Sequence, residues 1–462
     1  MEPLVRLSAA DLTNLAVEAA DTPMHQAVLA TIERAALVDA QGNVRIAELR
    51  DHVAARLSRV PELRRVLYRP PLFFGSPLWI DDRDFRIEDH VLLASLPAPG
   101  GESGAIAFAE QQMATLMDRS RPLWKIWILD GYSPDRLGLL IKLHHSVADG
   151  PAMVNMLGQI LDIEPGSMDA AGAPLSPGNP PSAGRLLADN IARKSAWLWR
   201  TITGATHPRR SLRQLRTLFA GGAEAIRQGL GAQLRPLNRP IGRTRRIAAF
   251  RVSLDEAKRV AHHFGVKLND VFFYAVASGC RRRLTASGQP LAGIRLRLSM
   301  AVSGSPVNVT SGNHAGTMIV SVPIDIDDPT ELLMAVASAT AAAKVKQMPI
   351  VSTGLMVFLA RIGFTRLFIR HQRMLNVLTT NLPGPPVPLY FAGGRIWSPI
   401  ALPPIAGNVT LSFAALSYGH ELSLSVIADG ATWPDLDPLI SSMQSSWHQL
   451  GEIATASGRL SA

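Results

Sequence analysis

The chain has 462 residues, of which 47% are hydrophobic and 18% are charged, and its 36 glycines and 33 prolines are spread along its whole length. This composition excludes an intrinsically disordered chain, a collagen-like repeat and a small disulfide scaffold. At about 150 residues per domain, the length predicts two or three domains with cores of their own. The one cysteine, Cys280, has no internal disulfide partner, and neither a secretory signal nor a run of about 18 apolar residues is visible. These features predict a cytoplasmic protein that does not span a membrane.

The first 162 residues are expected to form one domain that mixes helices and strands. Apolar residues recur at helical spacing over 46–58 and 105–118. Two short apolar runs, Leu123–Leu129 and Leu137–Leu143, are separated by a segment of turn-forming residues. This pattern predicts a β-hairpin.

The second strand of this hairpin leads into the most informative motif of the chain. The sequence reads HHSVADG from His144 to Gly150, and a helical pattern follows. An imidazole titrates near neutral pH, so it can take a proton from a hydroxyl that attacks an acyl carbonyl. Asp149 is expected either to cap the following helix or to pair with an arginine, and Gly150 to let a substrate approach the backbone. The alternative is that His144 and His145 are satisfied turn residues and that Asp149 is only a helix cap.

A second histidine pair provides an internal comparison. His262 and His263 lie on a helical pattern, and the residue four positions after the second histidine is Lys267 instead of an aspartate. We therefore interpret this pair as structural. The sequence contains no Gly-x-Ser-x-Gly elbow, no Gly-x4-Gly-Lys-Ser/Thr loop and no His-Glu-x-x-His, which argues against serine hydrolysis, nucleotide hydrolysis and zinc chemistry.

The middle of the chain, residues 163–245, is expected to be a linker followed by a basic helical crossover. Residues 163–184 are rich in Pro, Gly, Ser and Ala, and between Arg185 and Arg251 fifteen basic residues stand against two acidic ones. Aromatic residues are not interleaved in a sheet pattern there, so nucleic-acid binding is not expected. The leucines between Leu212 and Leu234 predict an amphipathic helix that either packs across two domains or lies on an anionic membrane surface. Trp197 and Trp199 allow the same two interpretations.

The remaining residues, 246–462, are expected to form a second α/β domain. It is predicted to contain a strand that runs into a helix, a buried helix and three further strands. These are Arg246–Asp255, Asn269–Leu284, and then Ile319–Ile324, Val409–Ala415 and Glu421–Ile427.

Together these segments resemble the bacterial wax ester synthase/diacylglycerol acyltransferases, including the triacylglycerol synthase-like proteins of mycobacteria. The resemblance extends over nearly the whole chain, and the stretch Leu12–Leu15 departs from the family pattern at a place that concerns local lipid contacts more than catalysis. The matching segments are Leu7–Asp11 with Met24-His25, Pro77-Leu78-Trp79, Arg121–Trp124, HHSVADG, Leu268–Val271, Thr380–Pro385, Ser417-Tyr418 and Pro434-Asp435.

The resemblance implies two chloramphenicol acetyltransferase-like α/β domains joined by a helical crossover, with an active-site tunnel between them. It implies transfer of a long-chain acyl group from acyl-coenzyme A to diacylglycerol or to a long-chain alcohol. His145 is then the general base, His144 a supporting residue, and Asp149 the organiser of a loop that ends at Gly150. Asn269 and Asp270 are implied as substrate-binding or site-supporting residues of the second domain, and Asn381 as a residue near the tunnel.

The resemblance implies no cofactor and no metal, with acyl-coenzyme A as a co-substrate. The expected partners are acyl-coenzyme A, diacylglycerol or a long-chain alcohol, and, by peripheral contact, an anionic membrane or lipid-droplet surface. Two other functions stay open at this point. One is a condensation-type transferase that takes its acyl group from a carrier protein, and the other is a catalytically idle lipid-binding relative.

Overall fold

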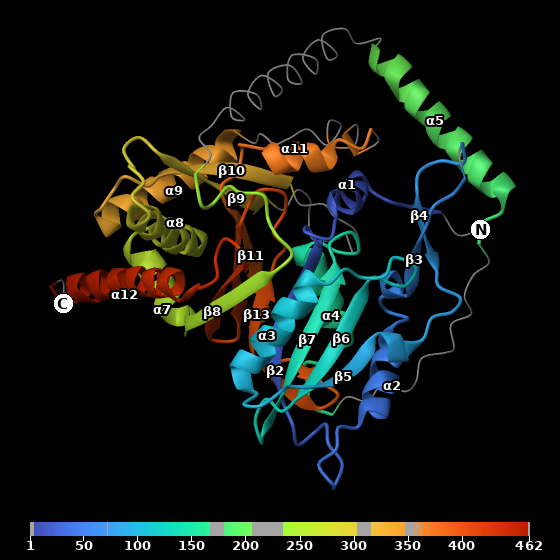
Figure 1. Ribbon diagram of the computed structural model, residues 1–462, viewed down its shortest axis with the longest axis horizontal. Coiled ribbons are helices and arrows are strands. Elements are labelled where there is room, and N and C mark those ends of the chain that lie inside the picture. Colours follow the sequence, from blue (N-terminus) through green and yellow to red (C-terminus); the bar gives the residue numbers. More distant parts are fainter. Residues whose placement is uncertain are drawn as a thin grey trace.

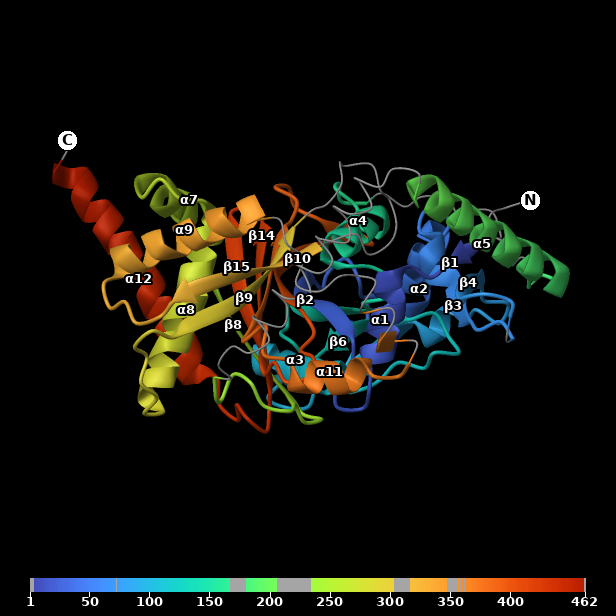
Figure 2. The ribbon, with the colours of Figure 1, turned by 90° about the horizontal axis from the view of Figure 1, so that it is seen from above.

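The computed structural model (Figure 1) describes residues 4–71, 73–166, 180–205, 234–302, 316–346, 356, 359–360 and 362–460. It consists of two α/β lobes that lie side by side along the longest axis of the molecule (Figures 1 and 2). The amphipathic helix predicted within 212–234 falls almost entirely outside the described residues. Among the described residues, no helix is long and apolar enough to cross a membrane.

The N-terminal lobe is built on a six-stranded sheet. Its strand order is β12-β13-β2-β7-β6-β5. The strands are β2 (His25–Glu33), β5 (Val91–Ser95), β6 (Trp124–Asp130), β7 (Arg136–His144), β12 (Tyr390–Phe391) and β13 (Gly394–Leu402). The other elements of the lobe are β1 (Val5–Arg6), β3 (Arg65–Tyr68), β4 (Leu78–Asp81), α1 (Ala9–Val17), α2 (Ile46–Arg56), α3 (Gly101–Ala114), α4 (Gly150–Ile160) and two short 3-10 turns, Pro61–Arg64 and Ile87–Asp89.

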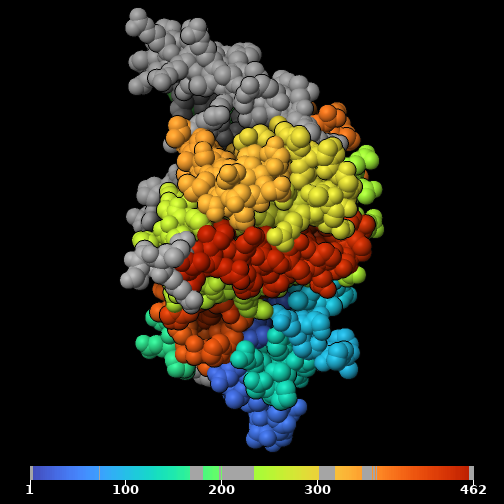
Figure 3. Space-filling view, turned by 90° about the vertical axis from the view of Figure 1, so that its left-hand side faces the viewer, coloured from blue at the N-terminus to red at the C-terminus, as the bar shows by residue number. Residues whose placement is uncertain are grey.

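The C-terminal lobe contains a four-stranded sheet of order β11-β14-β15-β8 and a separate two-stranded ribbon, β9–β10. Its strands are β8 (Arg245–Ser253), β9 (Arg295–Val302), β10 (Gly316–Pro323), β11 (Leu378–Pro383), β14 (Leu411–Tyr418) and β15 (Glu421–Asp429). Its helices are α7 (Leu254–His263), α8 (Leu268–Ala286), α9 (Pro329–Lys346), α11 (Thr365–His371) and α12 (Asp437–Leu460). In the space-filling view, the red α12 forms a band between the yellow and orange helices and the blue and cyan N-terminal lobe (Figure 3).

The C-terminal part of the chain contributes a strand to the sheet of the N-terminal lobe. β13 belongs to the last third of the chain, yet it pairs antiparallel with β2, with Ile400 opposite Leu29. A shared apolar core, which includes Leu129, Ile247 and Ile400, fills the space between the two lobes. The division of the chain at residues 162 and 246 stays a prediction, and the structure adds that the N-terminal sheet is completed by C-terminal residues.

The predicted helices and strands that fall on described residues are present with small shifts at their ends. The hairpin is formed by β6 and β7, and the helices expected over 46–58 and 105–118 are α2 and α3. β7 reads as a nearly continuous apolar run because it lies between β2 and β6 and eight of its nine residues are buried. Cys280 is fully buried in α8, and burial raises the pKa of its thiol to about 12.

Lys142 is a buried charge in this otherwise apolar strand. Its Nζ donates to the carbonyl oxygens of Gln112 at 2.5 Å and Thr115 at 2.7 Å, at the C-terminal end of α3. A cation stabilises such an end because the last carbonyls have no helical partners. Burial nevertheless lowers the pKa of Lys142 to about 7.

Helix α5 (Ala183–Ala205) lies next to the small β1–β4–β3 sheet and projects away from the lobes (Figures 1 and 2). Arg6 Nε donates to Asp189 at 2.9 Å, and Asn190 Nδ2 donates to the carbonyl oxygen of Phe73 at 2.6 Å. These two bonds attach the first half of α5 to the N-terminal lobe.

Candidate active site

The HHSVADG motif forms the turn between β7 and α4. The N–H of His145 donates to the carbonyl oxygen of Met24 at 2.8 Å, and Gln26 Nε2 donates to the carbonyl oxygen of Ala148 at 2.6 Å. The start of β2 therefore holds both ends of the turn. Asp149 is the N-cap of α4 and accepts from the N–H of Ala152 at 2.9 Å. The structure thus shows the cap, which is one of the two roles expected for Asp149.

His145 lies half-buried at the centre of the turn, and Asn14 of α1 contacts both its ring and its backbone. Asn14 Nδ2 donates to the carbonyl oxygen of His145 at 3.2 Å and lies 3.3 Å from Nδ1 of the ring. These contacts position the ring but do not set which of its two nitrogens carries the proton; a general base needs one bare nitrogen that faces the reacting hydroxyl.

Burial is the largest influence on the pKa of His145, and it lowers this pKa. A backbone hydrogen bond and the negative charges of Asp149 and Asp11 act in the opposite direction, and the neighbouring His144 adds a smaller lowering. The net effect is a pKa below that of a free histidine. His145 is therefore neutral at pH 7 and able to accept a proton.

His144 points to the opposite side of the sheet, into a fully buried cluster with Glu18 and His25. Glu18 Oε1 lies 3.1 Å from His144 Nε2 and 3.2 Å from His25 Nε2. Glu18 Oε2 accepts from Arg119 at 2.7 Å (Nη2) and 3.0 Å (Nε). This carboxylate thus ties the end of α1, the start of β2 and the end of β7 into one unit.

The protonation states of this cluster follow from its contacts. Burial alone would raise the pKa of Glu18, but the contacts with His144 and His25 outweigh it, so the pKa is lowered and the carboxylate is charged. Burial lowers the pKa of His25 to about 3, so this histidine is neutral. A neutral His25 provides a donor for the buried carboxylate without adding a buried charge.

Glu18, His25 and His144 also have the residue types and the spacing of a metal site, the one such group among the described residues. The tautomer of His144 argues against this use. The N–H of Ser146 donates to His144 Nδ1 at 3.0 Å, so Nδ1 accepts and the ring carries a proton on Nε2, which faces Glu18. A histidine ligand needs the reverse, with a bare nitrogen on the metal and an N–H on the outer side. The cluster fits a structural role, and the absence of a metal from the reaction stays a prediction.

The predicted residues of the second lobe lie around the end of β11. Asn381 Nδ2 donates to Asn269 Oδ1 at 3.2 Å, so these two side chains are brought together. Asp270 is buried, with Thr340 Oγ1 donating to Oδ1 at 2.6 Å and the N–H of Lys267 donating to Oδ2 at 2.9 Å. Both of its oxygens are used within the second lobe, which favours the supporting role over contact with substrate.

Gly150 is needed for the contact between the lobes. A Cβ at this position would come within 2.7 Å of Leu382, the residue after Asn381. The close approach expected at Gly150 is thus made by a side chain of the protein, and it joins the start of α4 to β11.

An apolar cavity of about 370 Å³ begins next to this contact. Ile141 of β7, Val154 and Gly158 of α4, and the turn at Pro383 and Gly384 are part of its wall. His145 itself lines neither this cavity nor the larger one described below. The cavity has the volume and the apolar wall typical of small-molecule sites, and it runs along α4, the helix that the motif opens.

Sequence reasoning missed Glu18, Arg119 and Asn14 as parts of the site. His25 was noted only as part of a family segment. The position of His25 indicates that a polar partner is needed, because a histidine at the start of an apolar strand must form a hydrogen bond when it is buried. The identity of that partner depends on tertiary contacts.

Comparison with known proteins gives the family. Residues 7–272 match the wax ester synthase/diacylglycerol acyltransferase catalytic domain, and residues 311–451 match the C-terminal domain of the same family. The chain belongs to this family. HHSVADG and the segment around Asn269 fall within the catalytic-domain match, and Asn381 falls within the C-terminal match.

Two relatives and two solved structures illustrate how far the similarity extends. A Mycobacterium tuberculosis (strain H37Rv) protein named as a diacylglycerol O-acyltransferase is 30% identical over 81% of this chain and 76% of its own length. A second one from the same strain is 30% identical over 82% of each chain. The Marinobacter aquaeolei wax ester synthase/diacylglycerol acyltransferase superposes with a TM-score of 0.70 at 21% identity, covering 98% of this chain and all of the other.

This member of the wax ester synthase/diacylglycerol acyltransferase family also shares its fold with condensation domains. The starter condensation domain of rhizomide synthetase superposes with a TM-score of 0.60 at 13% identity, over 98% of this chain and 94% of that domain. The two-lobed, chloramphenicol acetyltransferase-like fold expected from the sequence is confirmed.

Proposed function

We propose that this protein is an acyl-coenzyme A-dependent O-acyltransferase that acylates diacylglycerol or a long-chain alcohol, with His145 as general base. The observation that carries this proposal is the HHSVADG turn, which holds the half-buried ring of His145 against Asn14 between β7 and α4. The family match and the names of the relatives support the substrate class. No cofactor is needed beyond the acyl-coenzyme A co-substrate.

In the proposed reaction, the hydroxyl oxygen of the acceptor attacks the thioester carbonyl while His145 Nε2 takes its proton. The tetrahedral intermediate then collapses, the carbon–sulfur bond breaks, and the thiolate of coenzyme A receives the proton from His145. The products are an ester and free coenzyme A, and no covalent enzyme intermediate forms. Asp149 acts through the cap of α4, and Asn14 acts through the backbone carbonyl of His145.

The apolar cavity along α4 is proposed to hold an acyl chain, and Gly158 is proposed to set its length. A Cβ at Gly158 would meet no atom within 4 Å, and glycine in a helix interior costs about 1 kcal/mol relative to alanine. Replacing Gly158 by leucine is thus expected to fill the cavity without destabilising α4. The ratio of kcat/KM for palmitoyl- over octanoyl-coenzyme A should fall by about tenfold, which corresponds to two excluded methylenes at about 0.8 kcal/mol each.

Gly184→Leu provides the matched control for this measurement. Gly184 lies in α5, is equally open, and does not line the cavity. An unchanged chain-length ratio in Gly158→Leu would show that the acyl chain lies elsewhere.

Contact with a lipid surface is proposed for the α5 side of the N-terminal lobe. Phe73 is 82% exposed, and Ile191 and Trp199 of α5 are 58% and 67% exposed. Arg193 and Lys194 lie on the same helix and are exposed. Exposed large apolar residues beside basic ones suit an anionic lipid surface. A cytoplasmic location stays a prediction.

The function is tested by supplying palmitoyl-coenzyme A with either dioleoylglycerol or hexadecanol in vesicles, with and without phosphatidylglycerol. Release of coenzyme A and formation of neutral lipid are followed together. Equal amounts of both are expected, and the better acceptor identifies the substrate class. A faster rate on anionic vesicles is expected from the lipid contact. Absence of ester with both acceptors would contradict the proposed function and favour the carrier-protein or lipid-binding alternatives.

A further inference from the structure

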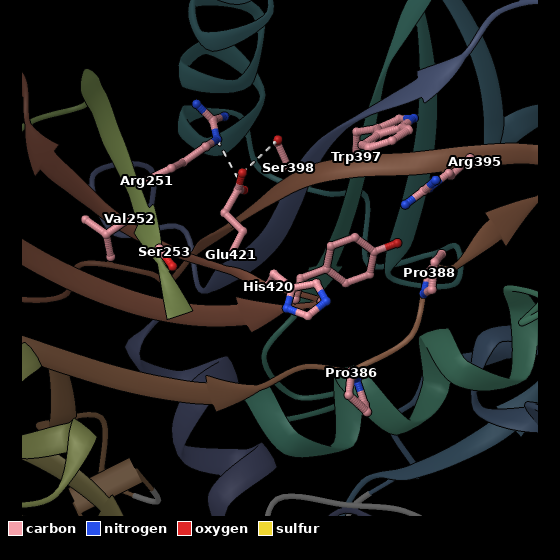
Figure 4. Close-up of a pocket in the computed structure, with 12 residues that line it drawn as sticks. Arg251, Val252, Ser253, Pro386, Pro388, Arg395, Trp397, Ser398, His420 and Glu421 are labelled. Atoms are coloured by element: carbon pink, nitrogen blue, oxygen red, sulfur yellow. Dashed lines mark hydrogen bonds and ion pairs between the residues drawn. The ribbon is translucent and has the colours of Figure 1, made fainter. Parts of the chain in front are cut away.

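A second cavity, of about 600 Å³, opens where the tip of the β14–β15 hairpin meets the end of β8 and the first half of β13 (Figure 4). It is far from the HHSVADG turn. Trp397 in its wall pairs with Thr31 of β2, and His144 pairs with His25 at the other end of the same strand. Six residues of strand separate the two places by roughly 20 Å.

Arg395 is the most unusual residue of this cavity. Its guanidinium carbon lies 3.8 Å from the centre of the Trp397 ring. Its Nε is buried without a hydrogen-bond partner, and no carboxylate of the described residues forms an ion pair with it. A guanidinium that lies over an aromatic ring keeps its N–H groups in its own plane, free to bind two oxygens of one anion.

The acidic groups nearby are already compensated. Glu421 is the one acid in the cavity wall; it lies 3.6 Å from Arg251 Nε and accepts from Ser398 Oγ at 3.3 Å. Figure 4 shows these three side chains meeting at one side of the cavity, away from Arg395 and Trp397. His420 lies 3.4 Å from Asp255. In the part of the chain that the structure describes, no acidic group neutralises Arg395, and its charge is available for a ligand.

The backbone at this place is strained. Ser398 has φ +46° and lies in the bulge of β13 between Trp397 and Ile400. Such a conformation costs roughly 1–3 kcal/mol for a residue with a side chain, and strain of this kind gathers at binding sites. Pro386, Pro388 and Tyr418 complete an apolar wall beside Arg395. The cavity has room for a group much larger than a bare anion.

We propose that this cavity binds a phosphate ester, with Arg395 on the phosphate oxygens and the Trp397, proline and Tyr418 wall against the organic part of the same molecule. Two sources share this chemistry, the phosphorylated nucleotide end of coenzyme A and the head group of an anionic lipid. The proposal does not depend on acyl transfer, because binding is measured without an acyl acceptor.

The test is calorimetric titration of the full-length protein with three probes, coenzyme A, 3′-dephospho-coenzyme A and dihexanoyl phosphatidate. It is carried out on the wild type, Arg395→Gln, Arg395→Lys and a control, Arg259→Gln. Arg259 is an exposed arginine of α7 that does not line the cavity. Arg395→Gln is expected to weaken binding of one phosphate probe by about 10- to 100-fold, because a charge-assisted pair is lost. The affinity of Arg395→Lys for this probe should lie between the affinities of the wild type and of Arg395→Gln. Added salt should weaken binding of the probe to the wild type.

The probes distinguish the two sources. If Arg395→Gln weakens binding of coenzyme A but not of phosphatidate, and if the wild type binds 3′-dephospho-coenzyme A more weakly than coenzyme A, the ligand is the nucleotide end of coenzyme A. A loss confined to phosphatidate identifies a lipid head group. Equal affinities of Arg395→Gln and Arg259→Gln for every probe, or no binding of any probe to the wild type, would overturn the proposal. The unfolding midpoint of Arg395→Gln should lie close to that of the wild type, since the variant loses the contact with the Trp397 ring but no ion pair with a described residue.

Discussion

Replacement of His145 by alanine is expected to lower kcat/KM for acyl transfer by about 10²- to 10⁴-fold, the range that a positioned general base contributes. The loss should appear mainly in kcat, because the imidazole acts on a proton in the transition state and adds little to ground-state binding. Coenzyme A release in the steady state, with the better of the two acceptors, measures it.

The pH profile of the wild type tests the same assignment independently. Because burial lowers the pKa of His145, kcat/KM should decrease on the acid side with a midpoint below about pH 6.5, the pKa of a free histidine. His263→Ala is a matched control, since this exposed histidine ends α7. If His145→Ala kept the activity of that control, His145 would not be the base.

Replacement of Glu18 by alanine is expected to lower the free energy of unfolding by about 3–5 kcal/mol, the range found when one partner of a buried ion pair is removed. Glu18 is 3% exposed, and its loss leaves His25, His144 and Arg119 without their shared acceptor. Because His144 precedes the base, the folded variant should also have a lower kcat. Urea unfolding and turnover below the unfolding transition measure the two effects separately.

Glu18→Gln keeps the shape of the side chain and one acceptor oxygen. Its free energy of unfolding should therefore decrease less than that of Glu18→Ala, by on the order of 1–3 kcal/mol. Glu33→Ala removes a carboxylate from an exposed position at the far end of β2, and it should change stability by no more than about 0.5 kcal/mol. Equal stabilities of Glu18→Ala and Glu33→Ala would show that the buried cluster does not hold the turn together.

Local patterns in the sequence predicted the part of the site that is contiguous in the chain. The apolar run, the turn residues and the helical spacing after Gly150 placed HHSVADG between a strand and a helix, and Asp149 is the cap that such a residue forms at a helix start. The position of these residues follows from rules that act over a few residues.

The rest of the site depends on contacts between distant residues. Glu18 and His144 are 126 positions apart, and no periodicity relates them. Asn14 lies in the stretch that departs from the family pattern, where the sequence predicts local lipid contacts, yet its side chain lies against the ring and the carbonyl of His145. The pairing of β13 with β2 also cannot be predicted from local patterns, because an apolar strand can pair with many others and only the packing of the two lobes selects its partner.

Because β13 completes the N-terminal sheet, the N-terminal half of the chain is expected to behave poorly as a separate fragment. A fragment that ends in the crossover would lack the strand that covers the outer edge of β2, and β2 carries eight buried or half-buried residues of nine. Its backbone N–H and C=O groups would then be open to pairing with other chains, as at any exposed, apolar sheet edge. The start of β2 also holds both ends of the histidine turn. The N-terminal half of the chain is therefore expected to be a complete folding unit only when the other half is present.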